Sequence, residues 1–353
     1  MSRELLVYPH YPNNPWQAMM YQSLPGLTVR VVEDPFALGS VDPAHAPVLH
    51  LNWTAPISQN APDIAESWRR VEGFLAGLDR YRAAGGRLLW SVHNVLPHET
   101  VHLGPELYLC RSLAERADTV LIMNPDTAAL TAPLYRLPPE RTVHLAHPSY
   151  LGRFPDEIDE AASRQRLGIG PEETVFLLLG VLRPYKGIEA LIDSFAALPR
   201  DAGPYRLLLA GEIGAGYDRA RLEHLVSADD RITAHIAFVP DEDIAGWLRA
   251  SDVVVLPYRQ SLNVSVASLA ASFDRPVALR SGPSARALLD EDWVFALPAD
   301  PDALFTAELA AIAADIRVNP RRAAAQRFAA ETAPERIAHA FAELLRPVLD
   351  HTP

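Results

Sequence analysis

Short runs of apolar, β-branched residues alternate with longer helical patterns along the whole chain, and this alternation restricts the fold more than any other feature. Such alternation is typical of α/β domains built on parallel sheets. We expect strands in the first half at residues 4–8, 48–51, 87–92, 119–123 and 142–145. In the second half we expect them at 174–179, 205–210, 232–238, 253–256, 276–279 and 293–296. The sequence therefore predicts two doubly wound, Rossmann-like halves.

The length of the chain and an irregular stretch near its middle predict the domain organisation. A chain of 353 residues exceeds the size at which a single hydrophobic core keeps growing. Residues 147–171 are polar and rich in Gly and Pro, as expected of a junction. We predict a first domain at 1–150, a second at 151–330, and a C-terminal helix within 331–353 that packs back toward the first. Ligands of open α/β sheets bind outside the carboxyl ends of the strands, so the two domains should face each other across a cleft.

Composition excludes several classes of function. The net charge of −12 argues against broad binding to nucleic acid or anionic lipid. A single cysteine, Cys110, excludes an internal disulfide and a multi-cysteine metal site. No stretch approaches the roughly 18–20 apolar residues that span a bilayer, and the N-terminus shows no export signal. We expect a cytoplasmic protein, with peripheral contact at the inner face of the membrane left open.

The loop RPYKG at 183–187 indicates phosphate binding. Of the 32 basic residues only Lys186 is a lysine, which suggests a position that needs a compact ammonium rather than a planar fork. Gly187 stands at the start of a predicted helix, where free amides and the helix dipole favour an anion. Arg183 can bridge two phosphate oxygens. The alternative is a solvated loop whose charges pair with Glu172 or Glu189, and the strand–loop–helix context favours phosphate.

This loop and an ordered series of motifs resemble GT-B glycosyltransferases of the family 4 type. The family's G-x-(L/I)-x-x-x-K-G turn matches residues 180–187. The series continues with HNVLPHE at 93–99, FVPDEDI at 238–244, ASDVVVLPYR at 250–259 and SFDRP at 272–276. The resemblance implies a hexosyltransferase-type enzyme that takes a sugar from a nucleotide-diphosphate donor with retention of anomeric configuration. It implies no metal and no cofactor, with UDP or GDP as the expected donor nucleotide.

The resemblance also assigns roles on the donor side. Arg183 and Lys186 would neutralise the donor diphosphate and stabilise the leaving nucleotide, and Gly187 would present its backbone to it. Val239 would lie in a loop that cradles the edge of the nucleobase. The residues expected at the second donor loop are Asn263, Val264 and Ser265, where small and hydroxyl side chains admit phosphate to a helix start.

The second donor loop also departs from the family pattern. Asn263 or Ser265 could instead be a plain helix cap, and both roles are compatible. Family 4 enzymes often carry two glutamates here, and Ser261 and Leu269 occupy those positions. A subset uses a Thr-Ser-Gly-Ser-like turn, of which 263–266 is a loose version. The departure leaves the donor sugar open and admits a degenerate member.

Candidate acceptor residues follow the first-half strands. The resemblance places His93 near the reacting centre of the transferred sugar. His98 and Glu99 could bind acceptor hydroxyls, with Glu99 as a weak base, or Glu99 could cap the next helix. The other acceptor-side candidates are Asn14, Asn52 and Trp53; Trp53 could instead be a packing residue, as we expect of Trp16.

Three alternatives to a transferase were weighed. A nucleotide-sugar epimerase would need acid and base carboxylates near the anomeric centre, and none is identified. A degenerate GT-B protein could bind sugar or a partner transferase without catalysis. A two-lobed periplasmic binding protein would need an export signal. The expected partners of the transferase are a nucleotide-sugar donor and a hydroxyl-bearing glycan, lipid-linked or small-molecule acceptor, as in polysaccharide or natural-product biosynthesis, and no nucleic acid.

Overall fold

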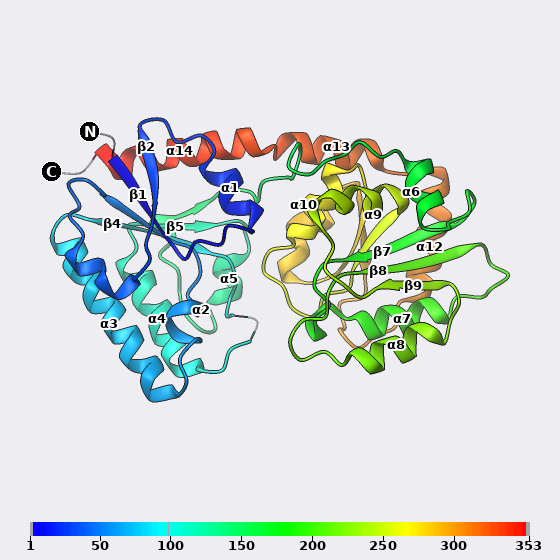
Figure 1. Ribbon diagram of the computed structural model, residues 1–353, viewed down its shortest axis with the longest axis horizontal. Coiled ribbons are helices and arrows are strands. Elements are labelled where there is room, and N and C mark those ends of the chain that lie inside the picture. Colours follow the sequence, from blue (N-terminus) through cyan, green and yellow to red (C-terminus); the bar gives the residue numbers. More distant parts are fainter. Residues whose placement is uncertain (1–2, 98, 351–353) are drawn as a thin grey trace. The chain divides into compact units, whose positions relative to one another are not determined.

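The computed structural model describes residues 3–97 and 99–350 of the chain. Its contacts divide it into two compact units (Figure 1). The first unit combines Met1–Pro148 with the C-terminal segment Pro334–Pro353, and the second spans Ser149–Ala333. Each unit contains its own six-stranded sheet.

The sheet of the first unit is parallel, with the strand order β2-β1-β3-β4-β5-β6. Its strands are β1 (Arg3–Tyr8), β2 (Leu27–Val31), β3 (Val48–Leu51), β4 (Arg87–Val92), β5 (Thr119–Ile122) and β6 (Thr142–His144). Its helices are α1 (Pro15–Tyr21), α2 (Ala55–Ser58), α3 (Ile64–Ala83), α4 (Leu103–Arg116), α5 (Thr127–Thr131) and α14 (Pro334–Asp350). Helices α1 and α14 lie on one face of this sheet, and α3 and α4 on the other (Figure 1).

The second sheet is also parallel, with the order β12-β11-β10-β7-β8-β9. Its strands are β7 (Thr174–Leu179), β8 (Tyr205–Ala210), β9 (Ile232–His235), β10 (Val253–Leu256), β11 (Val277–Arg280) and β12 (Val294–Leu297). Its helices are α6 (Glu160–Arg166), α7 (Ile188–Ala196), α8 (Arg219–Ser227), α9 (Ile244–Ala250), α10 (Ser265–Ser272), α11 (Arg286–Leu289), α12 (Thr306–Val318) and α13 (Arg322–Glu331).

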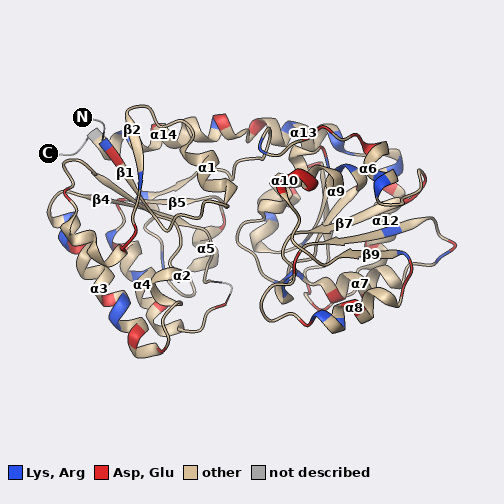
Figure 2. Cartoon of the chain, in the orientation of Figure 1, with Lys and Arg blue, Asp and Glu red and all other residues tan. Residues whose placement is uncertain are grey.

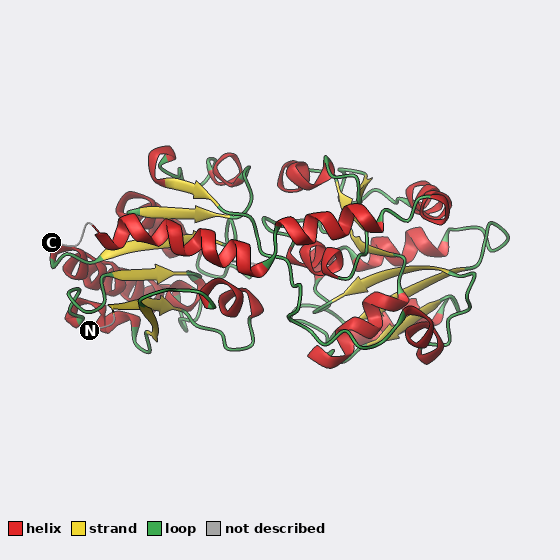
Figure 3. Ribbon diagram, turned by 90° about the horizontal axis from the view of Figure 1, so that it is seen from above, coloured by secondary structure: helices red, strands yellow, loops and turns green. Residues whose placement is uncertain are grey.

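Side chains of β7 show why these strands read as unbroken apolar runs. Val175, Leu177 and Leu179 pack into one core cluster, and Phe176 and Leu178 pack into the cluster on the opposite face. A strand covered by helices on both faces buries every side chain, so it loses the alternation of a half-exposed strand. Figure 3 shows helices on both faces of each sheet, and Figure 2 shows that most charges lie on helices and loops. The predicted pair of Rossmann-like domains is confirmed.

Strand β2 was not predicted. It lies at the edge of the first sheet and pairs only with β1, and Thr28, Val29, Arg30 and Val31 are all exposed. An edge strand buries little, so its sequence lacks the apolar run that identified the others. Strand β9 ends at His235, earlier than the predicted residue 238, because the chain turns away from the sheet edge there.

Helix α14 belongs to the core of the first unit. Ile337, Phe341 and Leu345 are buried in one cluster with residues of β1 and α1. The Phe341 ring lies 5.3 Å from the His50 ring and 6.0 Å from the Tyr21 ring. Within the described residues, no helix combines the length and hydropathy needed to cross a membrane.

We expect Phe341→Ala to destabilise the first unit by about 3–5 kcal/mol, because the truncation leaves a cavity in a closed core. Urea unfolding followed by circular dichroism would measure this as a lower urea concentration at the midpoint of the transition of the first unit. His339→Ala, at a position whose side chain is 74% exposed on the same helix, is the matched control and should change little. Equal midpoints for both variants would contradict the placement of α14 in this core.

Candidate active site

The loop after β7 brings the predicted phosphate-binding residues together. Pro184–Lys186 form one turn of 3-10 helix, and Gly187 then begins α7 in the left-handed conformation, at φ +68°. A Cβ at this position would lie 2.4 Å from the backbone oxygen of Pro257. Only glycine fits, because both the backbone angle and the close approach exclude a side chain. The loop is thereby held against the segment that follows β10.

Lys186 is a buried cation in this loop. Its side chain is 5% exposed, its Nζ lies 3.4 Å from the backbone oxygen of Leu179, and it sits 5.6 Å from the centre of the Tyr258 ring. Within the described part of the chain it forms no ion pair. Burial, and then repulsion by Arg183, lower the pKa of Lys186 from 10.5 to about 7. An anionic ligand would stabilise a buried cation of this kind more than it would stabilise a solvent-exposed one.

The alternative pairing of this loop with acidic neighbours does not occur for Lys186. Glu189 is engaged instead by Arg221, at 2.7 Å. The backbone oxygen of Glu172 accepts a hydrogen bond from Arg317. Arg183 is half-buried at the start of the turn, and its side chain runs against Gly214 in the loop after β8.

The second donor loop adjoins the first. The backbone N–H of Arg259 donates to the oxygen of Tyr185 at 2.7 Å, and the rings of Tyr185 and Tyr258 meet edge to face at 5.7 Å. Helix α10 begins at Ser265, and its N-cap Val264 makes no side-chain cap. The hydroxyl of Ser265 is hydrogen-bonded to Tyr150.

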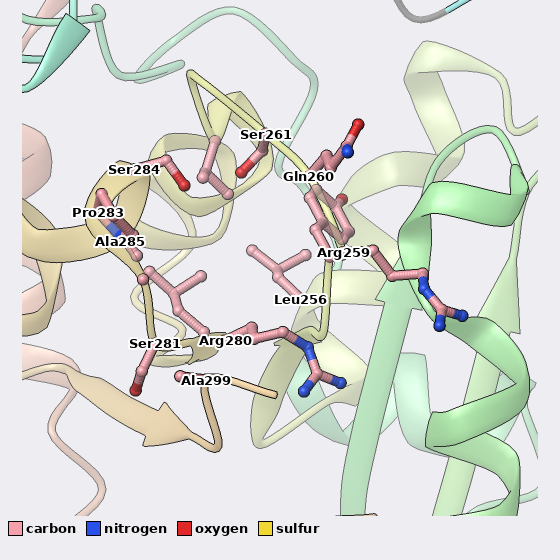
Figure 4. A pocket seen from close by; sticks show the side chains of 14 residues that line it. Leu256, Arg259, Gln260, Ser261, Arg280, Ser281, Pro283, Ser284, Ala285 and Ala299 are labelled. Carbon is pink, nitrogen blue, oxygen red and sulfur yellow. The ribbon is translucent and has the colours of Figure 1, made fainter. Parts of the chain in front are cut away.

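A cavity of about 160 Å³ lies beside this helix start (Figure 4). It is smaller than the roughly 300–1,000 Å³ of a typical ligand pocket, so it can hold only part of a ligand. In Figure 4 the side chains of Ser261 and Ser284 lie on one side, and the guanidinium groups of Arg259 and Arg280 on the other. The residues that line it include no Asp or Glu.

Sequence reasoning missed Arg280. It ends β11, is 8% exposed, and donates from Nε to the oxygen of Pro257 at 3.2 Å and from Nη1 to the oxygen of Pro298 at 3.0 Å. Burial, and then Arg259, lower its pKa. An arginine that ends an otherwise apolar strand was the available signal. It fastens the ends of neighbouring strands beneath the cavity.

Val239 lies in the connection between β9 and α9. It follows β9, an edge strand separated from β7 by β8, and packs partly buried against the core. The adjacent Phe238 is 65% exposed. Val239, Tyr185 and Val264 all pack against this same core cluster.

In the first unit, His93 is enclosed by tryptophans. Its ring stacks on Trp53 at 4.2 Å and 21°, and meets Trp16 edge-on at 4.5 Å. Burial, and then the neighbouring His50 and His147, hold the pKa of His93 well below its usual 6.5. The imidazole is therefore neutral near pH 7. Trp16 is 3% exposed, so the expectation that it packs is confirmed.

A chain of polar side chains lies behind His93. Asn52 donates from Nδ2 to the hydroxyl of Tyr21 at 3.2 Å, and this hydroxyl lies 2.9 Å from Nδ1 of His50. Nε2 of His50 lies 2.7 Å from Oγ of Ser91. If Tyr21 donates to Nδ1, then Nε2 carries the proton and donates to Ser91, an assignment made from the network. Burial lowers the pKa of His50 to about 3, which keeps it neutral.

The remaining acceptor-side candidates are dispersed. Asn14 caps α1, its side-chain oxygen accepting from the N–H of Trp16 at 3.0 Å. Glu99 is exposed, and the N-cap of α4 is His102 rather than Glu99. His98 lies outside the described residues. Over residues 3–97 and 99–350, no cluster of three or more His, Cys, Asp or Glu side chains has the arrangement of a metal site.

Comparison with known proteins gives matches to glycosyltransferases. Residues 173–315 match the family model described as Glycosyl transferases group 1. Over 318 residues the chain is 27% identical to the GDP-mannose:glycolipid 4-beta-D-mannosyltransferase of Xanthomonas campestris pv. campestris, covering 89% of this chain and 83% of that protein.

Solved structures match over nearly the whole chain. HepE of Anabaena, in complex with UDP and glucose, superimposes with a TM-score of 0.70 at 16% identity, covering 98% of this chain and 100% of the other. Sucrose-phosphate synthase of Thermosynechococcus elongatus gives a TM-score of 0.69 at 19% identity, covering 98% and 89%. At these identities the likeness shows the fold, which is GT-B.

The burial of Lys186 makes stability depend on pH. Its pKa is about 7 in the folded chain against 10.5 for an ordinary lysine, so below pH 7 the folded state carries the full cost of the buried charge. That cost falls as the pH rises from 7 toward 10.5, because the folded state releases the proton first. Ligand-free Lys186→Met should therefore exceed wild type in stability by on the order of 4 kcal/mol at pH 6 and 2 kcal/mol at pH 9.

Urea unfolding at both pH values would measure this difference. The control is Arg219→Met, which removes a cation with a 55% exposed side chain from the same unit and should show no pH-dependent gain. A difference between Lys186→Met and wild type that stays constant from pH 6 to pH 9 would show that Lys186 is not a desolvated cation.

Proposed function

We propose that this GT-B glycosyltransferase moves a sugar from a nucleotide-diphosphate sugar to a hydroxyl of a glycan, a lipid-linked sugar or a small molecule. The observation that carries the proposal is Lys186, a buried cation at the carboxyl end of β7 without an ion pair in the described chain. A diphosphate supplies the charge that this position lacks. It would also raise the pKa of Lys186 and keep the ammonium protonated.

The donor diphosphate would bind where the two loops of the second unit meet. Lys186 and Arg183 would contact its oxygens, with the amides that open α7 and the segment 263–265 completing the site. As the bond between sugar and phosphate breaks, negative charge grows on the leaving phosphate. Cations already in place stabilise that charge without reorganisation, and we propose that they do so without a metal or cofactor.

We propose UDP or GDP as the donor nucleotide. The mannosyltransferase from Xanthomonas is named for GDP-mannose, and the HepE structure holds UDP and glucose. The Xanthomonas enzyme is also named for a glycolipid acceptor, which supports a lipid-linked acceptor here. We propose a cytoplasmic protein that touches the inner face of the membrane when its acceptor is lipid-linked.

His93 would act as a neutral hydrogen-bonding group near the transferred sugar. Its low pKa excludes a standing positive charge, and the stacked Trp53 orients the ring. Asn52, Trp53 and Glu99 are the acceptor-side residues proposed with it, and His98 is retained from the motif. Asn14, the remaining acceptor-side candidate, caps α1 with its side chain and donates its backbone N–H to the oxygen of Tyr11.

A second candidate is a GT-B protein that binds a nucleotide sugar without transferring it. Ser261 and Leu269 favour it, because they stand where many family 4 enzymes carry glutamates. Formation of more glycoside than enzyme under excess donor excludes this candidate.

A thermal-shift panel of UDP-, GDP-, ADP- and dTDP-sugars tests the donor claim. We expect one nucleotide class to stabilise the protein, by roughly 2.7 kcal/mol at a concentration 100 times its Kd. Lys186→Ala should weaken that ligand about 10- to 100-fold, as expected for lost charge-assisted hydrogen bonds. Arg219→Ala is the control and should bind as wild type does. Unchanged affinity in Lys186→Ala for every nucleotide sugar would contradict the proposed diphosphate site.

The anomeric configuration of the product tests the stereochemistry. We propose retention, in which the acceptor attacks the face that the leaving phosphate vacates and the phosphate takes its proton. Inversion is the second candidate, favoured by the β-linkage in the name of the Xanthomonas enzyme, and it would require a base such as Glu99. From an α-linked donor we expect an α-linked product by NMR of the anomeric C–H coupling.

Glu99→Gln provides a second measure of the same question. With retention its kcat at saturating acceptor should stay within about twofold of wild type, whereas loss of a general base would lower kcat roughly 10²–10⁴-fold. A β-linked product together with such a loss would establish inversion.

A further inference from the structure

A carboxylate fully buried in the first unit accepts hydrogen bonds from two directions. Glu106, on α4, is 0% exposed and forms no ion pair within the described residues. Its Oε1 accepts from the hydroxyl of Thr54 at 2.5 Å, and its Oε2 accepts from Ser58 and from Nε2 of Gln59, the latter at 3.1 Å. The thiol of Cys110 lies 3.5 Å from Oε1. A buried carboxylate without a cationic partner requires several hydrogen bonds to its oxygens, and Glu106 accepts them.

The first direction leads to the segment that follows β3. Helix α2 has only four residues, too few to be stable alone. Thr54 stands at its N-cap but makes no side-chain cap, because its hydroxyl donates to Glu106 instead. Trp53 immediately precedes Thr54 and stacks on His93. The carboxylate therefore fixes the residue next to the indole that orients the imidazole.

The second direction leads to the loop between β4 and α4. While Nε2 of Gln59 donates to Glu106, its Oε1 accepts from the backbone N–H groups of Val101 and His102, at 2.8 and 2.9 Å. The other end of this loop is held by Tyr135, whose hydroxyl donates to the oxygen of Val95 at 3.0 Å. Gln59 thus joins the segment after β3, which carries Asn52 and Trp53, to the loop that carries Glu99.

We propose that Glu106 is a positioning residue for the acceptor: through Thr54 and Gln59 it holds the segments 52–59 and 99–102 at a set distance from each other. It does not touch the substrates. The inference rests on the proposed function, because it assumes that these segments bind a sugar acceptor. A carboxylate is needed, since Thr54, Ser58 and Gln59 all present donors. The amide of a glutamine accepts at one oxygen only and would turn its own N–H groups toward one of these donors.

Steady-state kinetics of two variants test the proposal. Glu106→Gln keeps the volume and removes an acceptor, and Gln59→Leu cuts the link to residues 101 and 102 while leaving Glu106 its two hydroxyl partners. The matched control is Glu115→Gln, on the same helix, where the side chain is 78% exposed. The donors are GDP-mannose and UDP-glucose, the acceptor probes are octyl glycosides of glucose, mannose and galactose, and hydrolysis of the donor is followed alongside.

We expect both variants to raise the KM for the acceptor roughly ten- to hundredfold, as misplacement of a positioning loop does. The KM for the donor and its rate of hydrolysis should stay within about twofold of wild type, because the donor loops belong to the other unit. The control should match wild type in every constant. A merely structural role would lower the amount of active enzyme and leave both KM values unchanged.

An unchanged acceptor KM, or acceptor and donor KM values that rise together, would overturn the inference. If Glu106→Gln fails to fold by circular dichroism, Gln59→Leu decides the question alone. A wild-type protein that transfers no sugar from either donor to any probe would overturn the proposed function and this inference with it. A wild type that transfers sugar, with variants that share its acceptor KM, would overturn the inference only.

Discussion

The second unit of this protein holds a cation out of water at the end of a central strand, and the proposed donor site depends on it. Lys186 is enclosed by the backbone of Leu179 and the ring of Tyr258, and burial lowers its pKa to about 7. Burial of an ammonium without an ion pair destabilises a protein, because the free energy of desolvation exceeds what such contacts contribute. In the proposed function, the diphosphate of the donor offsets this cost of desolvation. The contacts of Gly187 and Tyr258 would then hold the ammonium group at the position where the diphosphate binds.

The candidate site of the first unit is built from uncharged groups. Its candidate centre is a neutral imidazole between two indoles, backed by a hydrogen-bonded chain from Asn52 to Ser91. Among the described residues, the loops near His93 contain no helix that is long enough to be stable alone, since α2 has only four residues. They are tied instead to Glu106, whose buried carboxylate gathers donors from both. In the proposals made above, a buried cation binds the donor in the second unit, and a buried carboxylate positions the acceptor segments in the first.

Much of the fold, and the loop that we propose as the donor site, could be predicted from the sequence, and the misses share one cause. Strands buried on both faces were recognised because every side chain is apolar, whereas β2 escaped because an edge strand buries almost nothing. Lys186 stood out as the only lysine in a motif. Arg280 ends an apolar strand and Glu106 lies on a helix, and neither position by itself shows which groups the side chain contacts. Their roles come from partners 18 to 52 positions away.

The sequence by itself determined the α/β alternation, the loop with Arg183, Lys186 and Gly187, and the resemblance to GT-B enzymes. These features depend on local periodicity and on spacing along a single turn, which are written in consecutive residues. Tertiary structure alone decided that Lys186 is buried without an ion pair in the described chain and that His93 is neutral. Burial and hydrogen-bond partners depend on what other elements bring to a residue, and no local pattern records that.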